Sequence, residues 1–148
     1  MIAVDTNIFV YAHRGETRFH VAAATAIAGL VDGASRWAVP WSCLHEFFGV
    51  VTHPRIFRPP STTEEALEAV ARWIEVPNLV LLEETELHWQ TLRSLVAPAR
   101  IAGPRIHDAR IAAICIEHGV RELWSADRDF SRFPALKVVN PLLRPMSD

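Results

Sequence analysis

Residues 123–133, LWSADRDFSRF, run from apolar and small residues directly into two aspartates, Asp127 and Asp129. The first twelve residues, MIAVDTNIFVYA, repeat this arrangement, because their opening apolar run ends at Asp5. Strands that are apolar on both faces are typical of a parallel sheet covered by helices on both sides. In an open sheet of this kind, functional side chains gather beyond the carboxyl ends of the strands, where the strand order reverses. Both stretches therefore predict carboxylates at the end of a sheet where sites are built.

The rest of the chain alternates between strand and helix patterns. The expected strands cover residues 2–4, 36–40, 78–82, 122–126 and 136–139. The expected helices cover residues 17–33, 43–53, 61–75, 85–99 and 106–119. This alternation predicts an α/β fold with a parallel sheet between two layers of helices. With a length of 148 residues, we expect a single domain spanning residues 1–148.

Capping residues mark the starts of two of these helices. Ser42 is placed to cap the helix at 43–53 through its hydroxyl. Two overlapping capping boxes open the helix at 61–75, Ser61 with Glu64 and Thr62 with Glu65. Each box predicts a hydroxyl that accepts a hydrogen bond from a backbone N–H of the first turn.

Composition indicates a globular protein outside the membrane. Half of the residues are hydrophobic, 22% are charged and the net charge is −2, which is ordinary for a folded domain. No apolar run approaches the roughly 18 residues of a membrane span, and no basic segment followed by an apolar one suggests a signal peptide. The two cysteines, Cys43 and Cys115, lack metal-ligand spacing. We expect buried free thiols and a cytoplasmic protein.

Asp108 lies near the start of the predicted helix at 106–119, on its apolar face. At about 100° per residue, it shares that face with Ile111, Ala112 and Cys115. A carboxylate on the packed side of a helix requires a partner, and the helix N-terminus supplies less than about 1 kcal/mol. This position favours a functional role over a structural one.

The other acids carry weaker signals when judged by pattern. Glu46 lies roughly 150° from the middle of the apolar stripe of its helix, as an ordinary solvated glutamate would. Its neighbours three back and four on, Cys43 and Val50, are apolar and hint that it faces protein. Asp5 and Asp129 stand where an aspartate commonly caps a helix or forms a turn. Pattern alone therefore does not decide whether Asp5, Glu46 and Asp129 have a functional role or a purely structural one.

Carboxylates gathered at one end of a sheet need compensation. Two of them about 4 Å apart repel by roughly 4 kcal/mol at an effective dielectric of about 20. Such a cluster must take up protons or bind a cation. All-oxygen ligands select Mg²⁺ or Mn²⁺ over Zn²⁺, and these ions suit the hydrolysis of phosphodiesters by in-line attack of water. The histidines do not lie at zinc-ligand spacing.

Four motifs, in this order along the chain, resemble those of the PIN-domain ribonucleases. They are VDTNIFVYA (4–12), LHEFFGVV (44–51), IHDARIAA (106–113) and LWSADRDF (123–130). The greatest likeness is to the toxins of VapBC-type toxin–antitoxin pairs, and it runs from Met1 to about Pro141. A single DTN would be weak, but four ordered motifs at plausible spacing are fairly specific.

The resemblance assigns roles to residues of this chain. It implies four catalytic acids that also hold metal, namely Asp5, Glu46, Asp108 and Asp127. Asp129 matches a further acid of the family and is expected to bind metal or to orient a ligand. Ser125, before the last acid, and Asn7, after the first, are expected to support the site.

The same resemblance implies the fold and the partners. The fold is a three-layer α/β/α PIN-like domain with a central parallel sheet of five strands. The expected activity is that of an Mg²⁺- or Mn²⁺-dependent endoribonuclease, the toxin of a type II toxin–antitoxin pair, acting on RNA. The expected partners are a second copy of the chain and a small antitoxin, whose C-terminal segment lies in a groove near the active site.

The segment after Asp5 offers apolar surface for an antitoxin. It carries four apolar residues in a row, more than one packed face of so short a segment needs, namely Ile8, Phe9, Val10 and Tyr11. The helix at 17–33 is poor in charge along most of its length. The alternative is that the sheet covers all of these residues.

Two other classes of protein fit part of the pattern. A haloacid-dehalogenase-like phosphatase requires a second aspartate two residues after the first, where this chain has Asn7. A receiver domain requires an aspartate at the end of its central strand, and NLVLLEE (78–84) has none. A non-catalytic interaction module with this fold could lose its acids, and this chain retains them. A phosphotransfer domain and an interaction module are therefore the alternatives to a nuclease.

Overall fold

The strands form one parallel sheet at the centre of the molecule. In the computed structural model, which describes residues 1–143, the sheet has five strands in the order β3-β2-β1-β4-β5. The strands are β1 (Ile2–Val4), β2 (Trp37–Pro40), β3 (Leu79–Leu82), β4 (Glu122–Trp124) and β5 (Val138–Val139). Every neighbouring pair is parallel. The predicted α/β fold with a five-stranded parallel sheet is confirmed; residues 144–148 of the predicted domain lie outside the described part.

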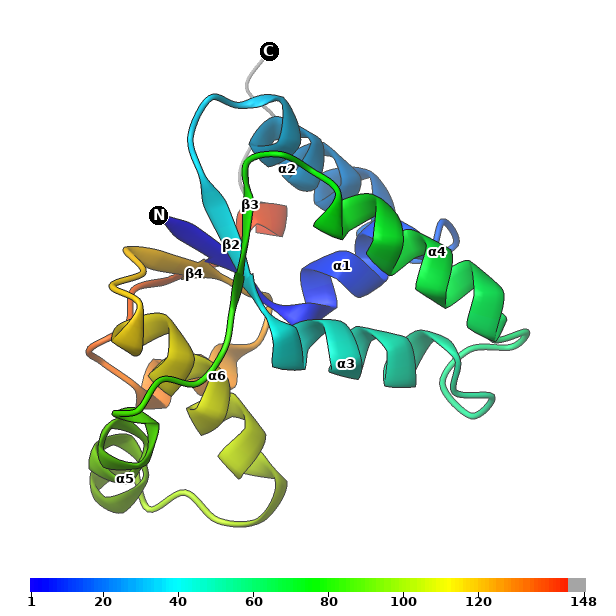
Figure 1. Cartoon of the computed structure of the whole chain (residues 1–148). Coiled ribbons are helices and arrows are strands. Elements are labelled where there is room, and N and C mark those ends of the chain that lie inside the picture. The colour runs from blue at the N-terminus through cyan, green and yellow to red at the C-terminus, as the bar shows by residue number, and fades with distance from the viewer. Residues whose placement is uncertain (144–148) are drawn as a thin grey trace.

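Six α-helices of the described chain cover the two faces of this sheet. They are α1 (Thr6–His13), α2 (His20–Asp32), α3 (Trp41–Val51), α4 (Thr63–Ile74), α5 (His88–Ala99) and α6 (Ile106–Glu117). Short 3₁₀ turns lie at Gly103–Arg105, Arg128–Arg132 and Pro141–Leu143. Figure 1 shows α1 to α4 on one side of the sheet and α5 and α6 on the other. Among residues 1–143, no helix is both long and apolar enough to cross a membrane.

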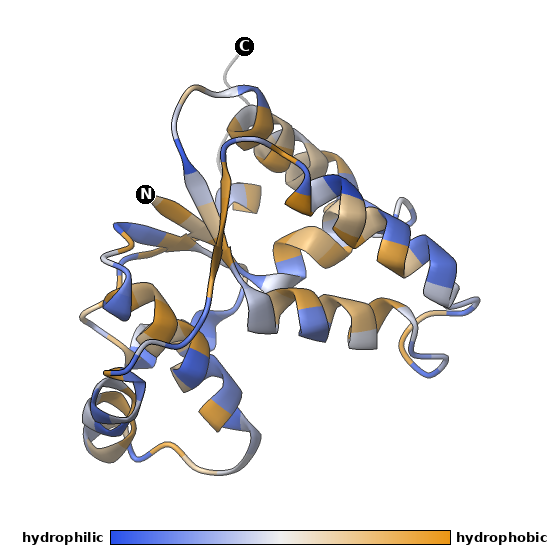
Figure 2. Cartoon of the chain, in the orientation of Figure 1, coloured by the Kyte–Doolittle hydropathy of each residue, from blue (hydrophilic) through white to orange (hydrophobic). Residues whose placement is uncertain are grey.

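The core joins the sheet to the helices through apolar and aromatic side chains. Figure 2 shows hydrophobic residues along β1 and β3. Trp37 of β2 is fully buried and stacks on Phe9 of α1, with ring centroids 6.4 Å apart. Trp73 of α4 packs against Phe9 at 4.6 Å and against Phe47 of α3 at 4.9 Å. These rings fix α1 and α3, which both begin at the carboxyl end of the sheet.

Local capping follows the sequence at one helix and departs from it at another. Thr62 caps α4 by accepting a hydrogen bond from the backbone N–H of Glu65 at 3.1 Å, as predicted. Ser61 instead bonds to His13 and Arg14 of α1. The predicted cap at Ser42 is wrong, because β2 runs directly into α3. Ser42 therefore lies inside the first turn of α3, whose cap residue is Pro40.

The strand order reverses between β1 and β4. The chain moves outward from β1 through β2 to β3, then returns to place β4 on the other side of β1. Asp5 follows β1 immediately, and its backbone N–H donates to the carbonyl of Trp124 in β4 at 2.9 Å. The carboxyl ends of these two central strands therefore meet where such sheets build their sites.

Candidate active site

Asp5 lies at the carboxyl end of β1 and is 4% exposed. Its Oδ1 accepts a hydrogen bond from the backbone N–H of Thr6 at 2.8 Å, so the residue caps α1. Oδ2 accepts a bond from Ser125 Oγ at 2.7 Å, and the Cys43 thiol lies 3.6 Å from Oδ1. Burial raises the pKa of Asp5 to about 6, although the bonds from Ser125 and Thr6 act against that rise. The aspartate therefore serves as a helix cap and also presents a poorly compensated carboxyl group.

Ser125 and Asn7 connect the ends of β1 and β4. Ser125 Oγ donates to Asp5 and accepts from the backbone N–H of Asp127 at 3.0 Å. Asn7 Nδ2 lies 3.5 Å from the same oxygen, while Asn7 Oδ1 accepts from the backbone N–H of Ala126 at 3.2 Å. These bonds join the ends of β1 and β4 beside Asp5 and Asp127, and a supporting role of both residues in the site stays a prediction.

Asp108, Asp127 and Asp129 form a compact group of carboxylates. Each offers one oxygen, and the three oxygens lie within 4.8 Å of one another. Asp108 comes from the first turn of α6, and Asp127 caps the 3₁₀ turn that follows β4 by accepting from the backbone N–H of Asp129 at 2.8 Å. Burial raises the pKa of Asp108 to about 6, with further increases from Asp127, Glu46 and Asp129.

Glu46 reaches the same place from α3. Its Oε2 accepts a hydrogen bond from the Thr6 hydroxyl at 3.1 Å. Thr6 also donates to the carbonyl of Cys43 at 3.3 Å, so it joins the start of α1 to α3. The helical-wheel argument placed Glu46 toward solvent, and its side chain is indeed exposed. Thr6 was not predicted as a site residue, although its position inside the DTN motif was an available signal.

One cavity of about 300 Å³ brings the predicted catalytic acids together. Its walls include Asp5, Glu46, Asp108 and Asp127, which come from four separate segments of the chain. Its other walls are mostly apolar and include Val10, Tyr11, Val50, Ile56 and Phe57. Asp129 is connected to this cavity through Asp127, which accepts a hydrogen bond from the Asp129 backbone N–H. The cavity therefore has an acidic part and an apolar part.

The donor set fits a hard divalent cation. The available ligands are carboxylate oxygens, the donors that Mg²⁺ and Mn²⁺ prefer. Within residues 1–143, no arginine, lysine or histidine forms an ion pair with the five site acids, Asp5, Glu46, Asp108, Asp127 and Asp129. The ion pairs of this part of the chain involve other acids. A cation held by Asp108, Asp127 and Asp129 would supply the missing compensation.

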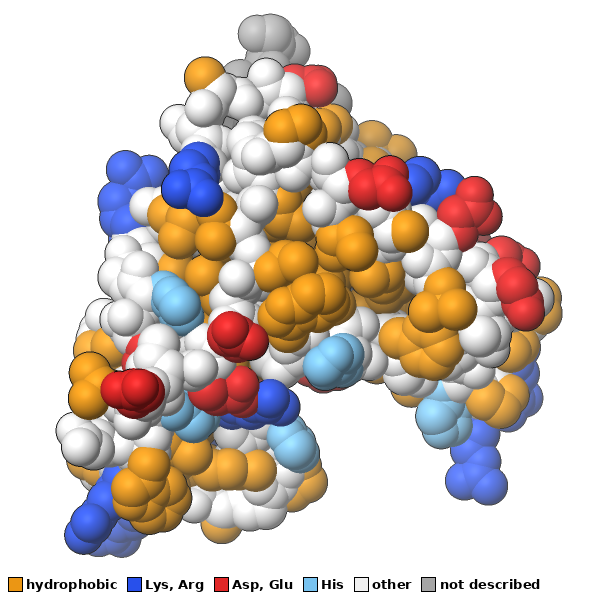
Figure 3. All heavy atoms as spheres, viewed as in Figure 1, with side chains coloured by type: hydrophobic (Ala, Val, Ile, Leu, Met, Phe, Trp, Pro, Cys, Tyr) orange, Lys and Arg blue, Asp and Glu red, His pale blue; other side chains and the backbone are white. Residues whose placement is uncertain are grey.

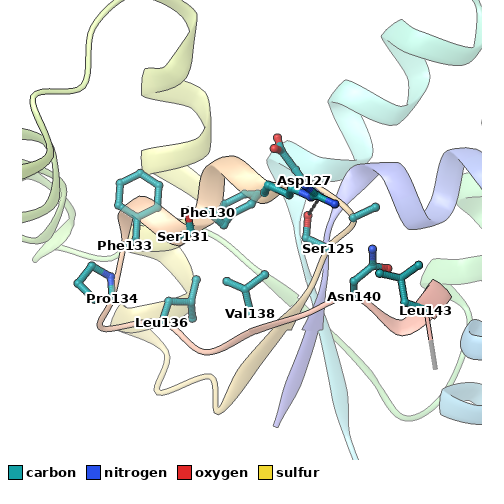
Figure 4. Close-up of a pocket in the computed structure, with 12 residues that line it drawn as sticks. Ser125, Asp127, Phe130, Ser131, Phe133, Pro134, Leu136, Val138, Asn140 and Leu143 are labelled. Atoms are coloured by element: carbon teal, nitrogen blue, oxygen red, sulfur yellow. Dashed lines mark hydrogen bonds between the residues drawn. The ribbon is translucent and has the colours of Figure 1, made fainter.

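A second cavity of about 490 Å³ lies on the far side of Asp127, below the ends of β4 and β5. Figure 4 shows Ser125 and Asp127 near one end and apolar side chains such as Phe133, Leu136 and Val138 along the rest. Phe130 and Phe133 are almost fully buried, so they form its floor and offer little ring surface for stacking.

Comparison with known proteins gives consistent matches over nearly the whole chain. The model of the family described as "PIN domain" matches residues 2–136. Ribonuclease VapC43 of Mycobacterium tuberculosis is 35% identical over 142 residues, covering 96% of this chain and 96% of the relative. Ribonuclease VapC33 of the same organism is 30% identical over 142 residues, covering 96% and 99%.

Solved structures share the fold at lower identity. VapBC2 from Rickettsia felis, bound to a DNA fragment from its promoter, matches with a TM-score of 0.70 and 19% identity, covering 95% of this chain and 98% of the other. VapC20 of M. tuberculosis, described as a toxin that cleaves the sarcin–ricin loop, matches with a TM-score of 0.65 and 20% identity, covering 88% and 93%.

Proposed function

Because this chain belongs to the PIN-domain family and, within it, to the VapC ribonucleases, we propose that it is a metal-dependent endoribonuclease and the toxin of a type II toxin–antitoxin pair. The observation that carries this proposal is the meeting of Asp5, Glu46, Asp108 and Asp127 in one cavity, where no basic residue of the described part of the chain forms an ion pair with them. Repulsion among these four carboxylates favours binding of a cation over a state in which they are ionised and hold no cation.

The proposed cofactor is Mg²⁺ or Mn²⁺, held by the carboxylates of Asp108, Asp127 and Asp129 with Asp5 and Glu46 beside them. When bound, such an ion offsets the charge of the phosphodiester and favours ionisation of water at neutral pH. The three aspartate oxygens within 4.8 Å of one another support this assignment.

The chain's own residues position the reactants. Ser125 and Thr6 fix the Asp5 carboxylate, and Thr6 also holds Glu46. In the proposed reaction, a water oxygen attacks the phosphorus in line while the bond from phosphorus to the leaving oxygen breaks. A site carboxylate takes the proton of the water, and the leaving oxygen is protonated from solvent. Without a cation, burial and the neighbouring acids raise the pKa of Asp108 to about 6, and a cation held by this carboxylate would oppose that rise.

No side chain is required as a covalent nucleophile. Cys43 is the thiol nearest to Asp5, but it is fully buried, and burial together with the charge of Asp5 holds its pKa well above the usual value. It therefore remains a neutral thiol, a poor nucleophile. The phosphotransfer alternative is also weak, because Asn7 binds the backbone of Ala126 where a dehalogenase-like enzyme would need its second acid.

A small antitoxin is the proposed partner at the apolar part of the acidic cavity. Ile8 and Phe9 are fully buried and Val10 is 7% exposed, so the core accounts for three of the four apolar residues predicted as antitoxin surface. Tyr11 is partly buried and lines the cavity together with Val10 and with Ile56, which is exposed. An amphipathic helix seated there could extend a basic residue toward the carboxylates and compete with the metal.

A homodimer is the proposed assembly. An apolar groove between α3 and α4 includes Trp41, Leu44, Phe48 and Leu67, and Figure 3 shows hydrophobic side chains gathered on this face. Leu67 is 57% exposed, and burial against a second copy would remove it from water.

Light scattering should give the mass of a dimer for the parent and of a monomer for Leu67→Glu. The matched control is Val21→Glu, since Val21 is 66% exposed on α2, away from the groove. A dimer that survives Leu67→Glu would exclude this face.

The test of the nuclease uses purified protein without antitoxin and an end-labelled RNA. Cleavage should require added Mg²⁺ or Mn²⁺ and should stop when a chelator is in excess. Undiminished cleavage with excess chelator would exclude the metal mechanism.

Expression in a bacterial host should slow growth, and co-expression with a cognate small partner should restore it. Harmless expression with all acids intact would exclude the toxin role but not the nuclease.

A further inference from the structure

A third cavity, of about 490 Å³, lies between α3 and α6 directly beside the acids. Glu46 and Asp108 line both this cavity and the acidic one, so the two open onto each other. From α3 come Ser42 and His45, and from α6 comes His107. Figure 3 shows the hollow between the α3–α4 side and the α5–α6 side, with histidine side chains along it. We call this space the α3–α6 cavity.

The α3–α6 cavity differs in charge character from the acidic one. The acidic cavity contains no basic side chain in its described lining, whereas this one contains His45, His107 and Arg110. Arg110 Nε donates to Glu84, which holds the guanidinium at the rim. Imidazole and guanidinium groups offer hydrogen-bond donors to phosphate oxygens and to base edges. A nucleic acid whose cleaved phosphate lies at the acids would find two imidazoles and a guanidinium on this side of them.

His45 is held in a position that suits base stacking. Its ring stacks on Trp41, with centroids 6.2 Å apart and an interplanar angle of 27°. His45 lines both the α3–α6 cavity and the apolar groove that contains Trp41, so its imidazole lies at the border of the two. Unpaired bases of single-stranded RNA bind by stacking on such rings.

Ser42 supplies an observation that points to a ligand independently of the rings. Its hydroxyl is buried and has no hydrogen-bond partner within residues 1–143. A buried hydroxyl without a partner costs free energy, so native proteins usually satisfy it with a ligand or water. Ser42 lies in the wall of the α3–α6 cavity, and its buried hydroxyl would meet a base edge there once the side chain turns toward the cavity.

We propose that the α3–α6 cavity binds the unpaired nucleotide next to the cleaved phosphate, with the base stacked on His45 and its edge near Ser42 and His107. This proposal rests on the proposed ribonuclease activity. A volume of about 490 Å³ falls in the range of pockets that enclose small ligands. The strand would pass from this cavity across Glu46 and Asp108 to the remaining acids, so the cavity selects which base flanks the cut.

The test measures RNA binding separately from cleavage. The probe is a 5′-fluorescein-labelled single-stranded RNA of about 12 nucleotides containing all four bases, bound to the Asp5→Asn protein and followed by anisotropy. His45→Ala, Ser42→Ala and His107→Ala should each weaken binding, with His45→Ala giving roughly a tenfold loss. His118→Ala is the matched control, because His118 lies at the opposite end of α6 from His107. It should change the affinity less than about twofold.

An abasic substitution locates the base. The cut is first mapped with the parent enzyme, and RNAs lacking one base on either side of that bond are then compared. At one of the two positions, loss of the base should weaken RNA binding as much as His45→Ala does. Binding of that abasic RNA to the His45→Ala protein should be no weaker than with either change alone. Additive losses, or equal affinities for all variants, would overturn the proposal.

Outcomes for the two proposals are distinct. If the parent protein cleaves the RNA and the cavity variants cleave and bind equally well, only the nucleotide subsite is wrong. If the parent protein cleaves no RNA with either metal, the proposed function fails first. Loss of antitoxin binding in the cavity variants, with RNA binding intact, would assign the cavity to the antitoxin and overturn the subsite.

Discussion

Two acids at opposite ends of α6 show what distinguishes the site from the rest of the fold. Glu117, the last residue of the helix, has a side chain only 1% exposed. It accepts hydrogen bonds from Thr85 N, Thr85 Oγ1 and His88 Nδ1 at 3.1, 2.6 and 2.7 Å. Asp108, in the first turn, is half-buried beside Asp127, Glu46 and Asp129, which are acids like itself.

The pKa values of these two acids move in opposite directions. For Glu117, burial acts to raise the pKa, but the hydrogen bonds from Thr85 and His88 outweigh it and the pKa is lowered. For Asp108, burial and the neighbouring acids raise the pKa to about 6. The helix dipole alone would favour the reverse order. Hydrogen-bond donors close to each carboxylate therefore decide its role. Glu117 has such donors and stabilises the fold, whereas Asp108 lies among other acids and is available to bind a cation.

The largest expected effect is on cleavage. Asp108→Asn should reduce the rate by at least about 10²-fold, because it removes a metal ligand. Glu117→Gln, measured below its unfolding transition, should cleave within about twofold of the parent, since that acid only holds α5 against α6. Asp32→Asn, at the end of α2, is a second control. An active Asp108→Asn enzyme would reduce Asp108 to a structural acid.

A smaller loss is expected when a supporting residue is changed. Ser125→Ala removes the donor to Asp5 and the acceptor for Asp127 N, and should lower cleavage by about 10- to 100-fold with the fold intact. Ser131→Ala, an exposed serine of the neighbouring 3₁₀ turn, should leave the rate unchanged. Equal rates for both variants would mean that Asp5 is oriented without Ser125.

Thermal unfolding separates the two acids in another way. Glu117→Gln should lower stability by about 1–3 kcal/mol, equivalent to roughly 2–4 °C per kcal/mol in a chain of this size. Glu68→Gln removes only the exposed pair with Arg72 and should cost less than about 0.5 kcal/mol. In metal-free buffer, Asp108→Asn should melt no lower than the parent, because repulsion is relieved. A large loss of stability there would show that Asp108 has a partner in the fold.

The pH dependence is the smallest effect and has a defined sign. A carboxyl group whose pKa is raised in the folded state favours folding at low pH, and this contribution is lost as pH rises through the folded value. For Asp108 the window runs from its ordinary pKa of 3.8 to about 6. The melting temperature of metal-free Asp108→Asn, relative to the parent, should therefore rise between pH 4 and 6 and stay constant above. A difference that is constant from pH 4 to 7 would contradict the raised pKa.

Much of the fold was predictable because hydrophobic pattern decides it. All five strands lie within their predicted ranges, since each is an apolar run bounded by polar residues. Helix α1 was not predicted, because its four apolar residues in a row lack a helical period and its cap, Asp5, directly follows the preceding strand. The cap at Ser42 failed for a related reason, since no residue separates β2 from α3.

The candidate site was less predictable from residue pattern alone. Asp108 was identified by its place on an apolar helix face, and its neighbours Ile111, Ala112 and Cys115 are indeed buried. Glu46 could not be identified that way, because its role depends on Thr6, about forty positions earlier in the chain. Glu117 lies on the face of α6 opposite Asp108, where its hydrogen bonds to Thr85 and to His88 of α5 could not be read from the period of α6 alone. Contacts between distant segments are not encoded in local periodicity.

Within residues 1–143, Asp108 at the start of α6 and the acids beside it have no basic partner, and we propose that they bind a divalent cation. Calorimetric titration of Mn²⁺ into the metal-free protein at pH 7.5 tests it most directly. We expect binding by the parent and by Glu117→Gln, and at least a tenfold loss of affinity in Asp108→Asn. Absence of binding in the parent, or equal binding in Asp108→Asn, would contradict the claim.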